Sequence, residues 1–220
     1  MKKLLITIDG PAGAGKTTVS RQLAERLEYT YIDTGALYRA VAHATDTKGI
    51  AADDDAGLEQ LCQGLEIAFV RQESGLRLMC NGADITDLIR TPQITMLASA
   101  VSARRVVRRF LLGLQREMGQ KKGVVFEGRD MGTIVFPEAD VKFFLSASAD
   151  TRALRRYKEM DGKTATTLEE VSADINRRDQ NDSTRELAPL KPAEDAIRID
   201  STNLSIREVV DLMISHIQNH

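Results

Sequence analysis

The sequence predicts a doubly wound α/β fold around a mostly parallel five-stranded sheet, because three features of the chain agree. Short apolar runs, typical of buried parallel strands, occur at residues 4–8, 29–32, 124–126, 141–145 and 197–199. Segments with the spacing of amphipathic helices separate most of these runs. A glycine-rich turn directly follows the first run, at the strand end where such folds place their ligands.

The N-terminal part begins with two strand-to-helix units. After the glycine-rich turn, an amphipathic pattern predicts a helix over residues 17–27. The second apolar run leads through Asp33-Thr34-Gly35 into a helical segment that reaches about residue 47. The acidic residues at 53–55 can cap a shorter helix that ends near residue 63.

A small antiparallel insert is expected to interrupt this order. Residues 65–70 and 76–80 have the composition of hairpin strands, and Ser74-Gly75 can form the turn between them. Asn81-Gly82 is a second strong turn signal. We therefore expect one domain over the whole chain, with an insert at residues 60–92.

The C-terminal half predicts helices between the remaining strands. Helical periodicity covers about residues 93–118, and a further helix is expected at about 150–160. Asp161-Gly162-Lys163-Thr164 has the composition of a hinge, and Thr167-Leu168-Glu169-Glu170 resembles a capping box for a helix to about residue 180. Because two helices joined by a hinge can close over a ligand, we expect a lid at about residues 150–185.

Bulk composition argues against several classes of partner. A formal net charge of −2 over 220 residues gives no global attraction to nucleic acid or to an anionic membrane. No apolar run approaches the roughly 18 residues needed to span a bilayer. The N-terminal lysines resemble the start of a signal peptide, but Asp9 ends the apolar run too early, so we expect a cytoplasmic location. Nothing in the sequence suggests an obligate partner, and we expect a monomer.

The glycine-rich turn has the pattern G-x-x-x-x-G-K-T at residues 10–17. Its glycines allow successive backbone amides to turn toward an anion, and the dipole of the following helix adds to that site. Lys16 can reach the β- and γ-phosphates, and the Thr17 hydroxyl can ligate Mg²⁺. The motif therefore predicts a nucleoside triphosphate site.

Two further motifs follow predicted strands. Arg39 lies one turn into the helix that starts after Asp33-Thr34-Gly35, where it could hold a second phosphate or remain a solvated side chain. In Glu127-Gly128-Arg129-Asp130-Met131-Gly132, Arg129 suits a phosphate, and Asp130 suits an exocyclic amine or a ribose hydroxyl. The alternative for this second motif is a turn with a surface ion pair.

The region expected to form a lid is rich in arginine. Arg178, Asp182 and Arg185 are spaced i, i+4 and i+7, so they share a face if the helix continues. A second row, on the preceding helix, consists of Arg152, Arg155 and Arg156. Such rows can place positive charge on a transferring phosphoryl group, or they can be ordinary solvated faces.

Together these motifs resemble those of the bacterial cytidylate kinases, a branch of the nucleoside monophosphate kinases and thus of the P-loop kinases. The resemblance covers essentially the whole chain, and the string GRDMGT at residues 128–133 is close to diagnostic. The other matching strings are IDGPAGAGK at 8–16, DTGALYR at 33–39, VFP at 135–137, APL at 188–190 and DST at 200–202. The insert at residues 60–92 fits, because this branch carries an extended acceptor-binding domain there.

The resemblance implies an activity and a donor site. The implied reaction is direct, in-line phosphorylation of CMP and dCMP by ATP to CDP and dCDP, with Mg²⁺, in pyrimidine nucleotide metabolism. Lys16 would contact the ATP phosphates and Thr17 the metal. The residues implied for ATP are Gly10, Pro11, Ala12, Gly13, Ala14, Gly15, Lys16, Thr17 and Thr18.

The resemblance also implies an acceptor site. The residues implied for CMP are Thr34, Arg39, Ser99, Arg108, Arg129, Asp130, Arg178, Asp182 and Arg185. Arg39 and Arg129 would hold the phosphate with Arg185 nearby. Cytosine would be read by Ser99, Arg108 and Asp130, and the sugar by Arg178 and Asp182. The residues expected to be catalytic are Lys16, Arg129, Asp130 and Arg185, and the lid residues are Arg152, Arg155 and Arg156.

Two other functions remain open from the sequence. The chain could be a P-loop kinase for another small acceptor, such as UMP or a shikimate-like molecule, although a small acceptor would not need the enlarged insert. It could instead be a nucleotide-binding switch without a second substrate. A guanine-specific switch would need a motif such as N-K-x-D, which the sequence lacks.

Overall fold

The computed structural model describes residues 3–72, 75–160 and 166–218. The chain divides into two compact units. The first consists of Met1–Asp33 and Met118–His220, and the second is Thr34–Glu117. Each unit has its own β-sheet.

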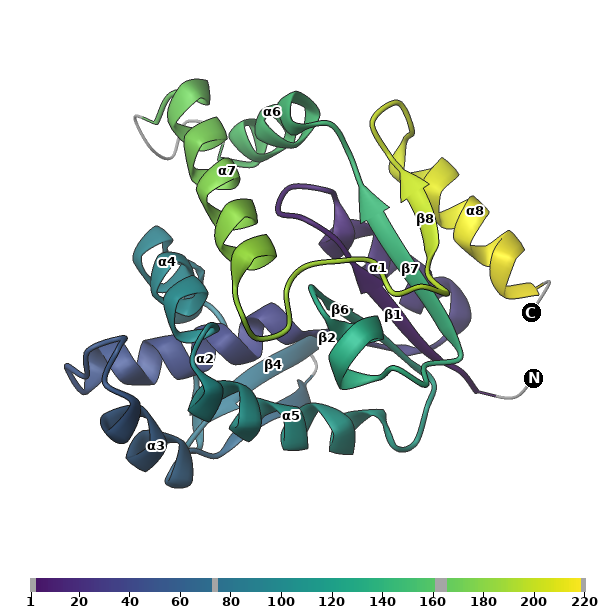
Figure 1. The fold of residues 1–220 in the computed structure, drawn as a ribbon. Helices are drawn as coiled ribbons and strands as arrows, with labels where there is room; N and C mark the ends of the chain where they lie inside the picture. The colour runs from purple at the N-terminus through teal and green to yellow at the C-terminus, as the bar shows by residue number, and fades with distance from the viewer. Residues whose placement is uncertain (1–2, 73–74, 161–165, 219–220) are drawn as a thin grey trace. The chain divides into compact units, whose positions relative to one another are not determined.

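The first unit is built on a five-stranded sheet in which every neighbouring pair is parallel (Figure 1). This confirms the predicted sheet and its strands. All five residues of the central strand β1 are buried, and they are apolar except for Thr7 and the terminal Asp9. In spatial order the strands are β2 (Thr30–Asp33), β6 (Val124–Gly128), β1 (Leu5–Asp9), β7 (Val141–Ser146) and β8 (Ile197–Asp200).

The helices α1 (Lys16–Leu27) and α8 (Ile206–Gln218) pack against this sheet. Strand residues Ile8 and Phe143 join Leu23 of α1 in one apolar cluster, and Met213 of α8 completes it. None of these four side chains is more than 1% exposed. The core therefore holds β1 and α1 rigidly, and the glycine-rich turn lies between them.

The predicted lid helices are α6 (Ala149–Met160) and α7 (Leu168–Thr184). The capping box is confirmed, because Thr167 Oγ1 accepts from the Glu170 amide and Glu170 accepts from the Thr167 amide. The helix runs to Thr184, beyond the expected end near residue 180. Arg185 has an extended backbone (ψ 137°) and ends the helix, so it does not complete the expected helical stripe. The predicted hinge at 161–164 lies outside the described residues.

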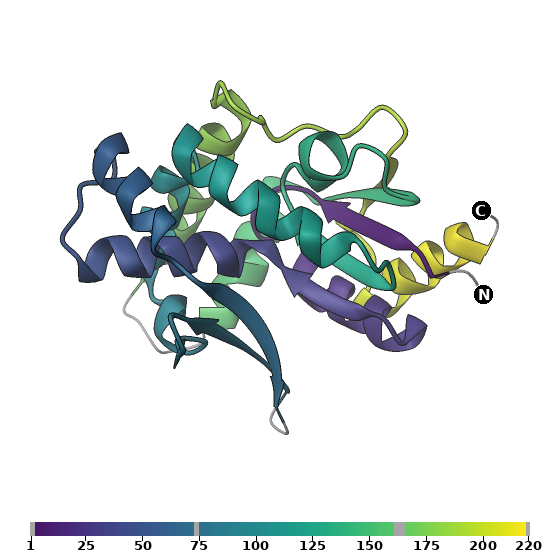
Figure 2. The same cartoon turned by 90° about the horizontal axis from the view of Figure 1, so that it is seen from below.

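The second unit combines helices with a three-stranded antiparallel sheet, whose strands β3 and β4 form the predicted hairpin (Figure 2). Its predicted turn includes Ser74, which lies outside the described residues. Asn81 and Gly82 have positive φ angles of 47° and 79° and form the two-residue turn from β4 to β5. The elements are α2 (Thr34–Thr47), α3 (Asp55–Gln63), β3 (Ile67–Gln72), β4 (Gly75–Cys80), β5 (Ala83–Asp84), η1 (Leu88–Arg90), α4 (Pro92–Val101) and most of α5 (Arg105–Gly119).

The helical periodicity at residues 93–118 proves to be two helices, α4 and α5. At the break, the Ser102 hydroxyl donates to the carbonyl of Ser99. The amides of Ala103 and Arg104 bond three residues back, which tightens and ends the turn. The apolar spacing continues across this break, so the sequence pattern does not reveal it.

None of the helices within the described ranges is long and apolar enough to cross a membrane.

Candidate functional site

The glycine-rich turn joins β1 to α1 in the first unit. At Gly10, a Cβ atom would lie 1.9 Å from the carbonyl oxygen of Leu145, so no side chain fits there. Gly15 precedes α1 in the left-handed conformation (φ 86°), and no side chain caps the helix. The first amides of α1 therefore have no side-chain acceptor at that capping position, which is typical of an anion site.

Lys16 is buried at the start of α1, with 4% exposure. Its ammonium group donates to the carbonyl oxygen of Pro11 at 2.6 Å. Burial lowers the pKa of Lys16, and the nearby charges of Arg129 and Arg178 lower it further, while Glu127 opposes them. Cations from α1, the β6 end and α7 thus lie within electrostatic reach of one another, which favours an anionic ligand.

Thr17 is joined to a buried carboxylate at the end of β6. Its hydroxyl donates to Glu127 Oε1 at 2.9 Å, and the Tyr31 hydroxyl donates to Glu127 Oε2 at 2.6 Å. Burial raises the pKa of Glu127. Hydroxyl and carboxylate oxygens are the donors that Mg²⁺ prefers, so this pair fits the predicted metal. Glu127 was not among the predicted site residues, although its position at a strand end beside the predicted Arg129 was a usable signal.

Four predicted residues of the first unit form one ionic network. Arg129 Nε donates to Asp182 Oδ2 at 2.9 Å, and Arg185 donates to Asp130 Oδ1 at 3.2 Å. Arg185 also lies 3.5 Å from Asp182 and donates to the Ala188 carbonyl oxygen at 2.6 Å. The β6 end and the C-terminal end of α7 therefore meet, and their charges are balanced two against two.

The predicted lid arginines have distinct partners. Arg152 donates to Asp179 and, at 2.9 Å, to the carbonyl oxygen of Ala12. Asp179 in turn accepts the Ala12 amide at 3.0 Å, which ties the glycine-rich turn to both α6 and α7. Arg155 binds Ser201, through the hydroxyl at 3.0 Å and the carbonyl at 2.6 Å. Asp179 was missed from the sequence, where it follows Arg178 in a charged helix without any distinguishing pattern.

Arg156, the remaining lid arginine, pairs with Glu159 at 3.1 Å on an exposed face. Arg178 lies in α7, and its charge acts on Lys16 as described above. The phosphate-binding roles of the lid arginines stay predictions.

The second unit contains the other predicted acceptor residues. Thr34 begins α2 and is 2% exposed, and Arg39 lies in the same helix. Arg108 of α5 stacks over the Tyr38 ring at 5.7 Å and donates to the Ser102 carbonyl oxygen at 3.2 Å. Within the described residues, the buried Oγ of Ser99 in α4 has no hydrogen-bond partner. A buried hydroxyl in that state is suited to a ligand's polar group.

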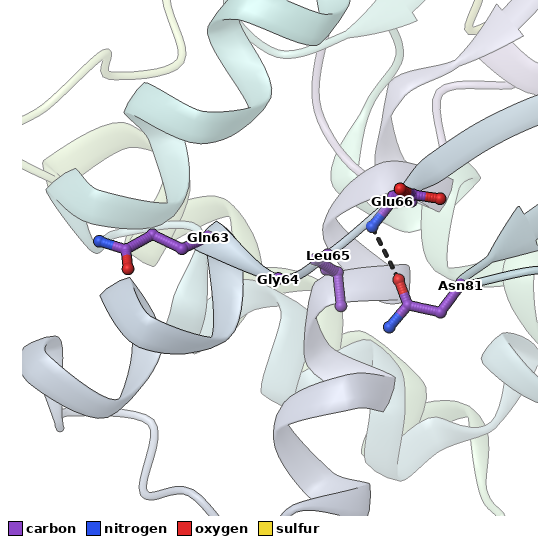
Figure 3. A pocket seen from close by; sticks show the side chains of 5 residues that line it. All are labelled: Gln63, Gly64, Leu65, Glu66 and Asn81. Carbon is purple, nitrogen blue, oxygen red and sulfur yellow. Dashed lines mark hydrogen bonds between the residues drawn. The ribbon is translucent and has the colours of Figure 1, made fainter.

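Two surface pockets of the second unit contain none of the predicted site residues. The smaller, of about 350 Å³, lies between the end of α3 and the β4–β5 turn, where Glu66 donates its amide to Asn81 (Figure 3). The larger, of about 540 Å³, is mainly apolar and includes Phe110 and Leu114 of α5. Neither pocket has the positive charge expected for a nucleotide phosphate.

Comparison with solved structures supports the fold. An uncharacterised protein from Eubacterium ventriosum aligns with a TM-score of 0.54 at 12% identity, covering 99% of this chain and 100% of that one. A shikimate kinase from Acinetobacter baumannii in complex with shikimate aligns with a TM-score of 0.50 at 15% identity, covering 99% and 94%. At these identities the likeness concerns the fold alone.

Sequence comparison is more specific. The family model described as cytidylate kinase matches residues 6–219. A cytidylate kinase from Geobacter sulfurreducens is 57% identical over 213 residues, which cover 96% of this chain and 91% of the relative. A cytidylate kinase from Ligilactobacillus salivarius is 47% identical and is covered completely, as is this chain. Because the model and these relatives span nearly every residue, the chain belongs to the cytidylate kinase family.

Proposed function

We propose that this chain transfers the γ-phosphoryl group of ATP to CMP or dCMP, giving ADP and CDP or dCDP in pyrimidine nucleotide metabolism. The observation that carries the proposal is the position of Lys16, which is buried at the start of α1 beside the glycine-rich turn and donates to the carbonyl oxygen of Pro11. Burial lowers its pKa, and the nearby charges of Arg129 and Arg178 lower it further. Lys16, Arg129 and Arg178 belong to separate parts of the first unit, and their charges lie within electrostatic reach of one another. Two phosphate groups approaching each other need such neutralisation, since phosphoryl transfer depends mainly on positioning and electrostatics.

On the donor side, the backbone of residues 10–18 would hold the ATP phosphates, with Lys16 on their terminal oxygens. The uncapped N-terminus of α1 supports this role. Thr17 and Glu127 would hold Mg²⁺, through the hydroxyl and a carboxylate-bound water or the carboxylate itself. When bound, the metal would neutralise phosphate oxygens and help to align the transferring group.

On the acceptor side, the residues proposed in the first unit are those of the ionic network described above. Arg129 and Arg185 would exchange part of their bonds to Asp182 and Asp130 for bonds to the CMP phosphate. The two carboxylates would then accept from sugar hydroxyls and the cytosine amine. In the second unit, the unpartnered hydroxyl of Ser99 supports a contact with the base.

Other acceptors provide the test of this assignment. ADP release would be measured with CMP, dCMP, UMP and AMP at matched concentrations, in the presence of ATP and Mg²⁺. We expect CMP and dCMP to be turned over much faster than AMP. Equal or better turnover of AMP would refute the assignment, and hydrolysis that no acceptor stimulates would favour a nucleotide switch. Omitting Mg²⁺ in the presence of a chelator should abolish turnover.

We also propose that the active form is a monomer located in the cytoplasm. The near-neutral net charge supports the absence of a nucleic-acid or membrane partner. Light scattering during size-exclusion chromatography, with and without both nucleotides, would test the oligomeric state.

A further inference from the structure

Asp9 is the last residue of β1, and both of its carboxylate oxygens are used within the protein. Oδ1 accepts the backbone amide of Met131 at 2.9 Å, and Oδ2 accepts that of Gly132 at 2.8 Å. The residue is 4% exposed. The carboxylate is therefore directed at two successive amides of one turn.

These amides begin η2 (Met131–Val135), a π-helical turn that directly follows Arg129 and Asp130. On the other side of this dipeptide, Gly128 pairs with the backbone of Asp9 in the parallel ladder between β1 and β6. One residue thus holds the chain on both sides of Arg129 and Asp130. Because a two-residue segment fixed at both ends has few alternative conformations, its side-chain directions depend on that residue.

The turn also lies close to the sheet beneath it. A Cβ atom on Gly132 would lie 3.1 Å from Thr7 Oγ1, 3.2 Å from Lys142 Cδ and 3.4 Å from Asp9 Oδ2. The first two contacts are tighter than most real contacts of a Cβ atom, so alanine at this position requires Thr7, Lys142 or the turn itself to shift by a few tenths of an ångström. The substitution Gly132→Ala therefore disturbs the same anchor while leaving Asp9 unchanged.

We propose that Asp9 is a positioning residue for the phosphate acceptor. By holding the turn after Arg129 and Asp130, it sets the orientation of these two side chains without itself touching a nucleotide. The inference rests on the proposed function, which assigns both residues to CMP. Loss of this anchor should therefore impair the use of CMP more than the use of ATP.

The charge on Asp9 supplies a second readout. Burial raises the pKa of Asp9 to about 6; Asp130 raises it as well, whereas the two amide bonds and Lys16 lower it. Lys142, whose side chain passes Gly132, is a further charged group facing this turn. A protonated carboxyl group presents an O–H to one of the two amides instead of an acceptor. Below about pH 6 the unmodified protein should therefore come to resemble the Asp9→Asn variant.

The experiment compares initial rates of the unmodified protein with those of Asp9→Asn, Gly132→Ala and Asp140→Asn, varying CMP and ATP separately. Asp140 is a matched control, because its carboxylate accepts the amide of Leu5 at 2.7 Å at the opposite end of β1. At about pH 7.5, loss of a hydrogen bond to a charged group should lower kcat/KM for CMP about tenfold in the first two variants. The KM for ATP should change less than about twofold. Asp140→Asn should change neither.

The pH profile distinguishes positioning from a merely structural role. Since nucleotide phosphates themselves titrate near about pH 6, the readout is the ratio of kcat/KM in the variant to that in the unmodified protein. For Asp9→Asn this ratio should rise toward one as the pH falls from about 7.5 to about 5, and for Asp140→Asn it should stay constant.

Three results would overturn the inference while CMP phosphorylation itself stands. These are unchanged CMP kinetics in Asp9→Asn, equal losses for CMP and ATP, and a ratio that does not vary with pH. If Asp9→Asn does not fold, unchanged CMP kinetics or equal losses in Gly132→Ala have the same meaning. Absence of CMP phosphorylation by the unmodified protein would instead overturn the proposed function.

Discussion

Replacing Asp9 by asparagine should also change how the stability of the fold depends on pH. Burial raises the pKa of Asp9 from its ordinary value of 3.8 to about 6 in the folded protein. Because the folded chain holds this proton more tightly than the unfolded chain, the residue's contribution to stability is complete below about pH 4. It is lost as the pH rises through about 6. A difference of about two pKa units corresponds to about 3 kcal/mol.

Asparagine carries no titrating group, so the comparison isolates this contribution. From about pH 4.5 to about pH 7.5, the free energy of unfolding of the unmodified protein should fall by about 2 kcal/mol relative to Asp9→Asn, since part of the titration lies below that range. Urea unfolding at a series of pH values, extrapolated to zero denaturant, measures both free energies. If the free energies of unfolding of the unmodified protein and of Asp9→Asn changed in parallel with pH, the buried, charged state of Asp9 would be refuted. A variant as stable as the unmodified protein at neutral pH but poor with CMP would support a positioning role.

Three further substitutions test other parts of the site. Arg129→Ala should lose about 2–5 kcal/mol of transition-state stabilisation in kcat/KM for CMP, whereas a collapse of ATP affinity would contradict its placement at the acceptor. Asp179→Ala removes the acceptor of the Ala12 amide and should raise the KM for ATP about fivefold. The control is Arg177→Ala, which removes an exposed ion pair on the same helix. Equal effects of the two substitutions on the KM for ATP would refute a specific link between Asp179 and the turn. Ser99→Ala should lower kcat/KM for CMP and dCMP alike by about three- to tenfold, and unchanged kinetics with both nucleotides would exclude its contact with the base.

The turn between β1 and α1 could be predicted in full because all of its determinants are local. An apolar run, glycines at fixed offsets and the pair Lys16-Thr17 lie within fourteen residues, from Leu4 to Thr17. The parallel sheet could be predicted for a related reason, since strands buried on both faces are continuous apolar runs. In the same way, the turn at Asn81-Gly82 follows from the backbone angles that its two residues favour.

The supporting carboxylates could not be found in this way, because their partners are distant in sequence. Asp9 bonds to an amide 122 residues further along, and Thr17 bonds to Glu127 across 110 residues. Both contacts depend on the spatial order β6-β1, which the alternation of strands and helices leaves undetermined. The predicted place of Arg185 on a helical stripe, which required the helix to continue, was wrong for the opposite reason. Its helical spacing was correct, but the helix ends one residue earlier.

Along the carboxyl edge of the first sheet, burial disfavours the charged forms of side chains to which we assign a role in the site. It lowers the pKa of Lys16 and raises those of Asp9 and Glu127, so the charged form of each group costs stability. A bound phosphate would favour the charged form of Lys16, and a bound cation that of Glu127. The carboxylate of Asp9 is instead bonded to two backbone amides. The free-energy cost of its charge must be offset by the apolar core beneath β1. We therefore expect that a rise in pH, which ionises Asp9, lowers the stability of the fold and improves the use of CMP.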